Sequence, residues 1–356
     1  MGLIKKKKVF FIIPSLSPSG AELFFSRLAS ELNEEYNITL ISLTQTKDEM
    51  QLPIDLRVIR YDAKRALTSI PSLFTTLVKE KPDVVFSTLI QVNMVVALLI
   101  PLFRKTIFYA RETLIPSMQY NEGKEKKIPK IVSNYLYPLF EKVIFQSNFM
   151  KQDHLKYFNS QFKNTVINNY VPSKSLSPSV IETDRLKLFT IARLNSVKQI
   201  DHMLKALAQV KKKRKIELTI YGDGQESENL HKLCQDLNIE NKVHFKGFYP
   251  NPINLCIDLD ALIMTSRYEG FPNAMLESLS IGKPVISYNS PGGIAEILTT
   301  ESLGILVEHN NIEELVKVLI NFDQKKFDPK RIRSIALSKF EKSKIINRYR
   351  ELIELA

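Results

Sequence analysis

Two glutamates eight positions apart, Glu269 and Glu277, have the residue type and the surroundings to bind a ligand rich in hydroxyl groups. They follow an apolar strand candidate at residues 261–265, and Pro272 between them suits the first turn of a helix ending at the capping residue Gly282. Free N–H groups at the start of such a helix bind anions. Ionised carboxylates accept the hydrogen bonds that sugar hydroxyls donate. The alternative is that both glutamates are solvated surface charges.

Two cations and several glycines stand at the ends of other predicted strands. Arg193 comes two positions after the end of the strand candidate 186–191, and Lys198 comes five positions after Arg193. This spacing suits the binding of a diphosphate. The alternative is that they are two of the 50 basic surface residues. The chain has only 11 glycines, so five of them at predicted strand ends indicate close backbone approach to a ligand rather than plain turns: Gly20, Gly222, Gly224, Gly292 and Gly293.

These motifs together resemble a known enzyme family. Glu269-Gly-Phe-Pro-Asn, continuing through Glu277 to Ser-Leu-Ser-Ile-Gly-Lys-Pro-Val-Ile, resembles the Glu-(seven residues)-Glu signature of the retaining family 4 glycosyltransferases of the GT-B fold. Four further stretches resemble, in the same order, the family's Gly-Gly-Ala-Glu loop, Gly-Arg-Leu…Lys segment, Gly-x-Gly turn and last glycine loop: residues 19–22, 192–198, 221–224 and 290–293. The resemblance covers nearly the whole chain and is strongest from Arg193 to Glu296.

The resemblance implies roles for these residues. Glu277 would contact the ribose of a nucleotide donor and Glu269 the sugar ring near the reacting centre. Arg193 and Lys198 would stabilise the charge on the leaving diphosphate, without a metal ion or other cofactor, and the configuration would be retained. The expected donor-binding residues are Gly20, Arg193, Lys198, Gly222, Gly224, Glu269, Gly270, Phe271, Asn273, Glu277, Gly292 and Gly293.

The chain departs from the family at one position. Many members place a histidine after an N-terminal-domain strand, whereas the strand candidate 107–110 is followed here by Arg111 and Glu112. Arg111 is therefore a candidate catalytic or acceptor-binding residue. The alternative is a structural ion pair between Arg111 and Glu112.

Short apolar runs alternate with amphipathic stretches in both halves of the chain, which predicts parallel sheets with crossover helices. The strand candidates are residues 9–14, 38–43, 84–87, 107–110 and 143–146, then 186–191, 217–222, 243–245, 261–265, 285–288 and 304–307. A Ser- and Pro-rich linker at 171–179 separates the halves. We expect an α/β GT-B fold with two Rossmann-like domains, 1–175 for the acceptor and 176–338 for the donor, facing a cleft, and a C-terminal helix at 339–356 packing back on the first.

Composition narrows the setting. Two cysteines in 356 residues exclude a disulfide framework and indicate a reducing, cytoplasmic location. No apolar run is long enough to span a bilayer. Peripheral contact with the inner face of the cytoplasmic membrane is predicted from Lys5–Lys8, residues 124–127, and a segment at 128–140 in which apolar and polar groups interleave, namely Ile131, Tyr135, Leu136, Leu139 and Phe140. The alternative is that these are a solvated lysine face and a core helix.

Competing functions fit less well. The first strand is not followed by Gly-x-Gly-x-x-Gly, which argues against a nicotinamide oxidoreductase, and no P-loop sequence occurs. A net charge of +12 leaves nucleic-acid binding open, although no recognition motif is present and we expect no nucleic acid partner. A GT-B nucleotide-sugar epimerase also stays open. The prediction is a glycosyltransferase that moves a hexose or N-acetylhexosamine, from UDP-sugar, to a lipid-linked or surface glycan such as a polysaccharide or lipopolysaccharide.

Overall fold

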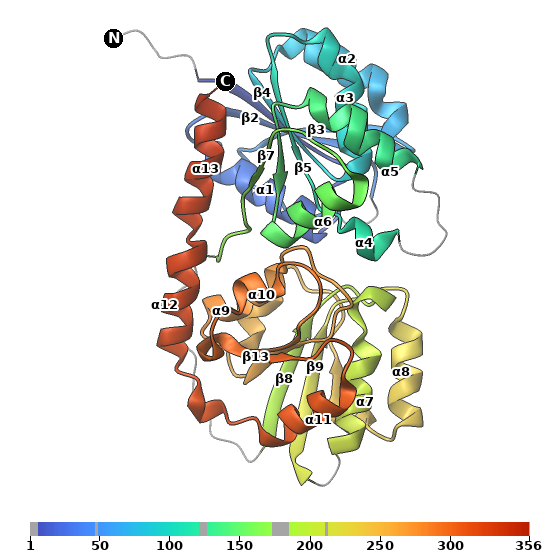
Figure 1. Ribbon diagram of the computed structural model, residues 1–356, viewed down its shortest axis with the longest axis vertical. Helices are drawn as coiled ribbons and strands as arrows, with labels where there is room; N and C mark the ends of the chain where they lie inside the picture. Colours follow the sequence, from blue (N-terminus) through green and yellow to red (C-terminus); the bar gives the residue numbers. More distant parts are fainter. Residues whose placement is uncertain (1–5, 47–48, 121–126, 173–184, 211–212, 356) are drawn as a thin grey trace. The chain divides into compact units, whose positions relative to one another are not determined.

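The computed structural model describes residues 6–46, 49–120, 127–172, 185–210 and 213–355 (Figure 1). The chain divides into two compact units: unit 1 comprises residues 1–169 and 343–356, and unit 2 comprises 170–342. The predicted boundary at residue 175 and most of the linker at 171–179 fall on residues 173–184, which lie outside the described residues. The second change of unit lies between residues 342 and 343, whereas the sequence analysis placed it between 338 and 339.

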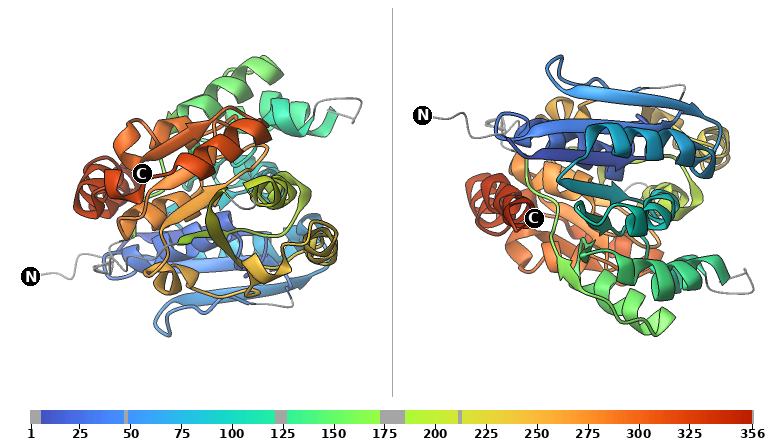
Figure 2. Two further views of the ribbon diagram at one scale, coloured as in Figure 1. Left: turned by 90° about the horizontal axis from the view of Figure 1, so that it is seen from below. Right: turned by 90° about the horizontal axis from the view of Figure 1, so that it is seen from above.

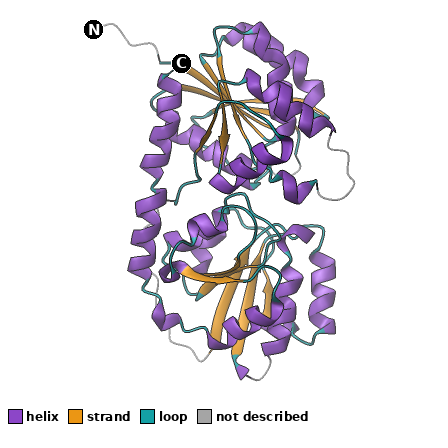
Figure 3. Ribbon diagram, in the orientation of Figure 1, coloured by secondary structure: helices purple, strands orange, loops and turns teal. Residues whose placement is uncertain are grey.

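Unit 1 contains a parallel seven-stranded sheet in the order β3-β2-β1-β4-β5-β6-β7 (Figure 3). Its strands are β1 (Lys8–Ile13), β2 (Asn37–Thr44), β3 (Arg57–Ala63), β4 (Val84–Thr88), β5 (Ile107–Arg111), β6 (Lys142–Phe145) and β7 (Asn164–Val166). The central strands β1 and β4 are almost wholly buried because helices cover both faces of a parallel sheet. The expected doubly wound sheet is confirmed, and β3 and β7 add one strand at each edge.

The helices of unit 1 lie on the two faces of this sheet. They are α1 (Gly20–Leu32), α2 (Ile70–Glu80), α3 (Ile90–Leu99), α4 (Pro116–Gln119), α5 (Lys127–Ile131), α6 (Asn148–Phe158) and α13 (Lys342–Glu354). Shorter turns are η1 (Ala66–Ser69), η2 (Ile100–Leu102), η3 (Val132–Leu136) and η4 (Tyr137–Leu139). Crossover connections between parallel strands are right-handed. Helix α1 connects β1 to β2, toward the β3 edge of the sheet, and lies on one face. Helices α2, α3 and α5 belong to connections toward the β7 edge and lie on the opposite face (Figure 2).

Helix α13 is the last element of the chain and completes unit 1. Tyr349 is fully buried, with its ring 6.2 Å from that of Phe24 and 5.7 Å from that of Phe86. The Tyr109 hydroxyl donates to the carbonyl of Leu352 at 2.9 Å. The predicted return of a C-terminal helix to the first domain is thus seen, with α13 beginning three residues later than expected.

Unit 2 contains a parallel six-stranded sheet in the order β10-β9-β8-β11-β12-β13. The strands are β8 (Arg185–Ile191), β9 (Lys215–Tyr221), β10 (Val243–Phe245), β11 (Ala261–Met264), β12 (Val285–Tyr288) and β13 (Gly304–Val307). The helices are α7 (Ile200–Val210), α8 (Ser227–Asp236), α9 (Asn273–Ser280), α10 (Ile294–Ile297), α11 (Ile312–Asn321) and α12 (Pro329–Phe340). One apolar core joins the sheet to α7, α8 and α11, and a second joins it to α9, α10 and α12. All six predicted strands are present.

Helix length and the two cysteines bear on the setting. Among the residues that the structure describes, no helix has both the length and the apolar character to cross a bilayer. Cys234 and Cys256 are both buried free thiols. Burial raises the pKa of the Cys256 thiol to about 12, so this group is un-ionised at neutral pH.

Candidate active site

The loop between β11 and α9 carries Glu269 and is fixed by the loop that follows β12. Glu269 donates its N–H to the carbonyl of Pro291 at 3.1 Å, and its own carbonyl accepts from the N–H of Gly293 at 3.0 Å. These bonds form an isolated parallel bridge between Glu269 and Gly292. Both loops leave the carboxyl edge of the unit 2 sheet, where parallel α/β sheets bind ligands. The bridge therefore holds the Glu269 backbone at that edge.

The Glu269 carboxylate binds two donors with the same oxygen. Its Oε1 lies 2.6 Å from Nζ of Lys198 and 2.6 Å from Oγ of Ser266. The side chains of Glu269 and Lys198 are 11% and 24% exposed, and Ser266 is buried. The structure thus brings together two predicted site residues and adds Ser266, which the sequence analysis missed. The available signal was a hydroxyl residue directly after the strand that precedes Glu269.

Lys198 is positioned by its own loop, which follows β8. It ends the short turn η5 (Ser196–Lys198), whose N-terminus Asn195 caps through its side chain. The Thr265 hydroxyl, at the end of β11, bonds to the carbonyl oxygens of Lys198 at 3.2 Å and Gln199 at 2.7 Å. The cation and the carboxylate therefore come from neighbouring strands β8 and β11.

Glu277 lies on α9, in its second turn from Asn273. It is 8% exposed, and the Ser280 hydroxyl bonds to its backbone carbonyl at 2.6 Å. Glu269 is 9% exposed. The alternative that both glutamates are solvated surface charges is therefore wrong. A carboxylate is buried only where hydrogen bonds or opposite charges offset the cost of removing it from water, so neither glutamate is an ordinary surface residue.

The glycines of unit 2 are required by packing within the chain. A Cβ at Gly222, where φ is +140°, would lie 1.8 Å from the Ala192 carbonyl oxygen, and a Cβ at Gly224 would lie 2.3 Å from that of Leu194. A Cβ at Gly293 would lie 2.5 Å from the carbonyl oxygen of Gly270. From the sequence, these glycines were predicted to allow close approach of a ligand. The structure shows that they bring the loops after β8, β9, β11 and β12 against one another.

The remaining predicted residues of unit 2 differ in exposure. Arg193 is exposed on the loop after β8, and Asn273 is the partly exposed first residue of α9. Phe271 is buried, with its ring 5.4 Å from that of Phe340. The Phe271 side chain is therefore a core group, which leaves only its backbone for a donor. Gly292 has a φ of +126° and makes the tight turn after β12.

Two predicted residues belong to unit 1. Gly20 is the first residue of α1, directly after the β1 loop. Arg111 ends β5 and is fully buried, with its guanidinium 4.2 Å from the ring centroid of Phe24 and its Nη2 donating to Oδ1 of Asn169. Burial lowers the Arg111 pKa, and Tyr349 opposes this shift. Arg111 thus packs in the interior under α1 and α13, and its predicted contact with a ligand is not consistent with this position.

The alternative for Arg111 is also wrong, because Glu112 has other partners. Its Oε1 accepts from the N–H groups of Thr113 at 2.7 Å and Leu114 at 3.0 Å, and its Oε2 accepts from the Tyr137 hydroxyl. Burial raises the Glu112 pKa, and these hydrogen bonds oppose the increase. His154 lies beside this group, with Nδ1 4.0 Å from Glu112 Oε2, and burial lowers its pKa to about 3. This buried cluster fixes the loop after β5, and no spacing in the sequence indicates it.

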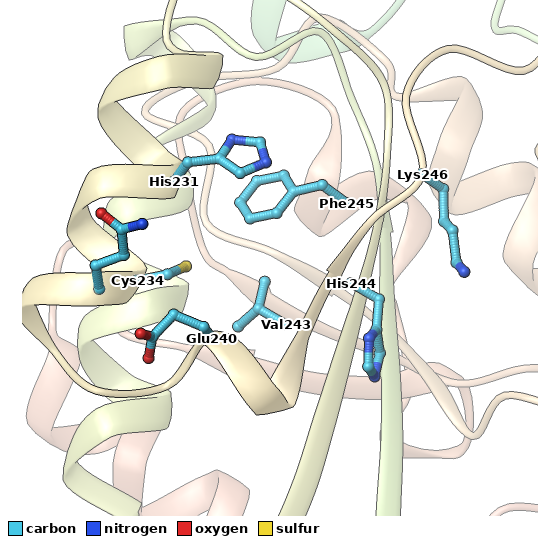
Figure 4. A pocket seen from close by; sticks show the side chains of 8 residues that line it. His231, Cys234, Glu240, Val243, His244, Phe245 and Lys246 are labelled. Carbon is cyan, nitrogen blue, oxygen red and sulfur yellow. The ribbon is translucent and has the colours of Figure 1, made fainter.

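A pocket of unit 2 lies away from Glu269, between α8 and the edge strand β10 (Figure 4). The His231 ring stacks on the ring of Phe245 with centroids 3.9 Å apart, and Cys234 and Lys246 also line the pocket. None of the predicted site residues lines it. Among the described residues, no three His, Cys, Asp or Glu side chains are grouped to hold a metal ion.

Comparison with known proteins places this architecture in a family. Residues 174–337 match the family described as glycosyl transferases group 1. This segment is a group 1 glycosyltransferase domain. The predicted group 1 glycosyltransferase family, the GT-B fold and the enzyme class are thereby confirmed, since the structure also has two Rossmann-like parallel-sheet units. Retention of configuration stays a prediction.

Individual relatives of this glycosyltransferase differ in how much of each chain is shared. The poly(glycerol-phosphate) alpha-glucosyltransferase of Bacillus subtilis is 33% identical over 151 residues, which is 42% of this chain but only 22% of that protein. The N-acetylgalactosamine-N,N'-diacetylbacillosaminyl-diphospho-undecaprenol 4-alpha-N-acetylgalactosaminyltransferase of Campylobacter jejuni is 26% identical over 70% of both chains. Anabaena HepE, crystallised with UDP, has the same fold, with a TM-score of 0.78 at 18% identity over 98% of this chain and 100% of that one.

Proposed function

We propose that this glycosyltransferase moves a hexose or N-acetylhexosamine from a UDP-sugar to a hydroxyl group of a lipid-linked or surface glycan, with retention of configuration. The observation that carries the proposal is the Glu269–Lys198–Ser266 cluster at the carboxyl edge of the unit 2 sheet. The Campylobacter relative is named for transfer to a diphospho-undecaprenol acceptor, and the HepE structure contains UDP. The first supports a lipid-linked acceptor, and the second supports a UDP-sugar donor.

The cluster supplies the charges that such a transfer needs. When the bond between the anomeric carbon and the diphosphate oxygen breaks, negative charge grows on the departing UDP. The Lys198 ammonium and the exposed Arg193 guanidinium are two cations at this edge, and the N–H groups at the start of α9 add partial positive charge. We infer that, when the donor binds, the Lys198 ammonium contacts the diphosphate and its ion pair with Glu269 weakens.

The two glutamates then have separate tasks. Glu269 keeps its bond to Ser266 and accepts from hydroxyls of the transferred sugar, and Glu277 accepts from the ribose. We propose that these protein cations make a metal ion unnecessary. We also propose that the enzyme works at the cytoplasmic side of a membrane that carries its acceptor, with peripheral contact.

Calorimetry tests the donor site. UDP, GDP and ADP are titrated in EDTA into the wild type, Glu277→Ala and, as the matched control, Glu313→Ala, which removes an exposed carboxylate from α11 of the same unit. We expect UDP to bind most tightly, Glu277→Ala to weaken it at least tenfold, and Glu313→Ala to leave it unchanged. UDP binding that requires added Mg²⁺, or equal UDP binding by the wild type and both variants, would contradict the proposal.

Product analysis tests the reaction. Incubation with UDP-sugars and lipid-linked acceptors is expected to give a product whose anomeric configuration equals that of the donor, as read from its NMR coupling constants. Glu269→Ala is expected to lower turnover without weakening UDP binding. Release of free sugar without acceptor glycosylation would refute the transferase reaction and favour an epimerase.

A further inference from the structure

We propose that unit 1 docks on an anionic lipid bilayer through the outer surface of α2, α3 and α5, here called the α2–α3–α5 face. It comprises the exposed side chains of residues 64–80, 98–105 and 127–139. The proposal deepens the membrane contact in the proposed function, on which it rests, by naming the surface and the lipid charge.

Exposed apolar side chains gather on this face. Nine of the fifteen large apolar side chains exposed among the described residues belong to it, each between 41% and 72% exposed. They are Leu67, Phe74, Val78, Leu98, Leu102, Ile128, Ile131, Tyr135 and Leu139. Scattered single apolar side chains are normal on a protein surface, but a group of this size marks an interaction site.

The three helices that carry these side chains are neighbours. Helix α3 contacts η1, η2 and η3, and η1 contacts α2. The Phe74 ring on α2 lies 5.8 Å from that of Phe103, directly after η2. Figures 1 and 2 show α2, α3 and α5 together on the face of the sheet opposite α1. The apolar groups thus form one surface.

The charge of the α2–α3–α5 face is one-sided. Its three segments contain seven basic residues, all exposed, and one acidic residue. The basic residues are Lys64, Arg65, Lys79, Arg104, Lys105, Lys127 and Lys130. The acidic residue, Glu80, is bonded to Arg57 at 2.9 Å. Basic side chains around an apolar surface match the headgroups and acyl boundary of an anionic bilayer.

The charge argues against a second copy of this chain as the partner. A symmetric dimer through this face would set seven basic residues against the same seven, with one carboxylate on each side. Like charges across an interface are unfavourable. A bilayer with anionic headgroups has the complementary charge.

The face differs from the one expected from the sequence. Lys7 donates to the carbonyl of Ile353 at 3.0 Å, and Lys8 donates to that of Glu80 at 2.8 Å. Lys7 and Lys8 therefore make hydrogen bonds within unit 1. Lys5 and residues 124–126 lie outside the described residues. Phe140 is buried, whereas Ile128 is exposed. Helices α2 and α3 were not predicted to take part.

Vesicle sedimentation tests the proposal. Full-length protein is mixed with vesicles of phosphatidylcholine alone or with 30% phosphatidylglycerol, and compared with the variants Leu102→Glu/Ile131→Glu and Lys105→Glu/Lys130→Glu. The matched controls, Ile54→Glu of unit 1 and Leu255→Glu of unit 2, change exposed apolar residues outside the face. We expect binding only to the anionic vesicles, lost at least tenfold in both double variants and unchanged in the controls.

Two further measurements separate the possible failures. UDP calorimetry on the same variants shows whether the donor site is intact. Loss of vesicle binding by a variant that still binds UDP normally supports the α2–α3–α5 face. Failure of the wild type to bind UDP refutes the proposed function instead. Equal vesicle binding by all variants overturns the proposal. The proposal is also overturned if the wild type does not bind vesicles and light scattering shows that it forms a dimer that Leu102→Glu/Ile131→Glu disrupts.

Discussion

Replacing Glu269 by glutamine should tighten the binding of UDP while it slows transfer. In the free enzyme Lys198 is held by Glu269 at 2.6 Å, with side chains 24% and 11% exposed. Exposed ion pairs contribute about 0.2–1 kcal/mol, and breaking a buried pair costs about 3–5 kcal/mol. This pair lies between these limits, so releasing Lys198 to the diphosphate is worth about 1–2 kcal/mol. The Kd of UDP should therefore fall roughly 5- to 30-fold.

Calorimetry on four proteins measures this effect. They are the wild type, Glu269→Gln, Lys198→Met and the double variant, each in EDTA. A fifth protein, Glu313→Gln, is the control for loss of one carboxylate. UDP carries no sugar, so the contact of Glu269 with sugar hydroxyls does not enter the comparison. The gain from Glu269→Gln should vanish when Lys198 is absent. An unchanged or weaker Kd for Glu269→Gln, or a gain that persists in Lys198→Met, would refute the reasoning.

Three other perturbations have expected outcomes. Ser266→Ala removes a donor 2.6 Å from Glu269, so kcat should fall about 5- to 15-fold with less than a twofold change in the Kd of UDP; equal kcat values would show that the hydroxyl does not position the carboxylate. Gly222→Ala places a Cβ 1.8 Å from the Ala192 carbonyl oxygen at a φ of +140°, so it should cost at least about 2 kcal/mol, and an unchanged Tm would contradict this. His154 has a folded-state pKa of about 3 against an ordinary 6.5, so the unfolded chain binds its proton first and stability should fall as pH drops from 6.5 toward 3. In His154→Phe the stability lost over this range should be smaller by up to about 1.4 kcal/mol per pH unit, and denaturant titrations with parallel pH profiles would exclude that role.

The alternation of apolar and amphipathic stretches was sufficient to predict the central strands of both sheets. β1 and β11 are apolar on both faces, as is typical of a parallel sheet covered by helices on both sides. The edges were missed for a physical reason. β3 carries two exposed arginines because one side of an edge strand meets water, and β7 has three residues, too few for a pattern.

The candidate site was predicted in its residue types but not in its contacts. Glu269 and Lys198 are 71 residues apart, and they pair because β8 and β11 are adjacent in the sheet. Local sequence patterns do not indicate which strands are adjacent. Arg111 was misplaced for the same kind of reason. Tyr349, which helps to bury it, lies more than 200 positions away on the last helix. Local patterns identify a strand end, but only the fold decides whether a later segment covers it.

Helix α13 has a consequence for how the protein is made. Unit 1 is interrupted by residues 170–342, so a ribosome releases most of its sheet long before the helix that carries Tyr349 exists. At about 5–20 residues per second, those intervening residues take roughly 10–35 s to synthesise. During that interval the apolar surface around Phe24 and Phe86 lacks its final cover. Chaperone binding to nascent chains should therefore peak at unit 1 and end only when α13 leaves the ribosome.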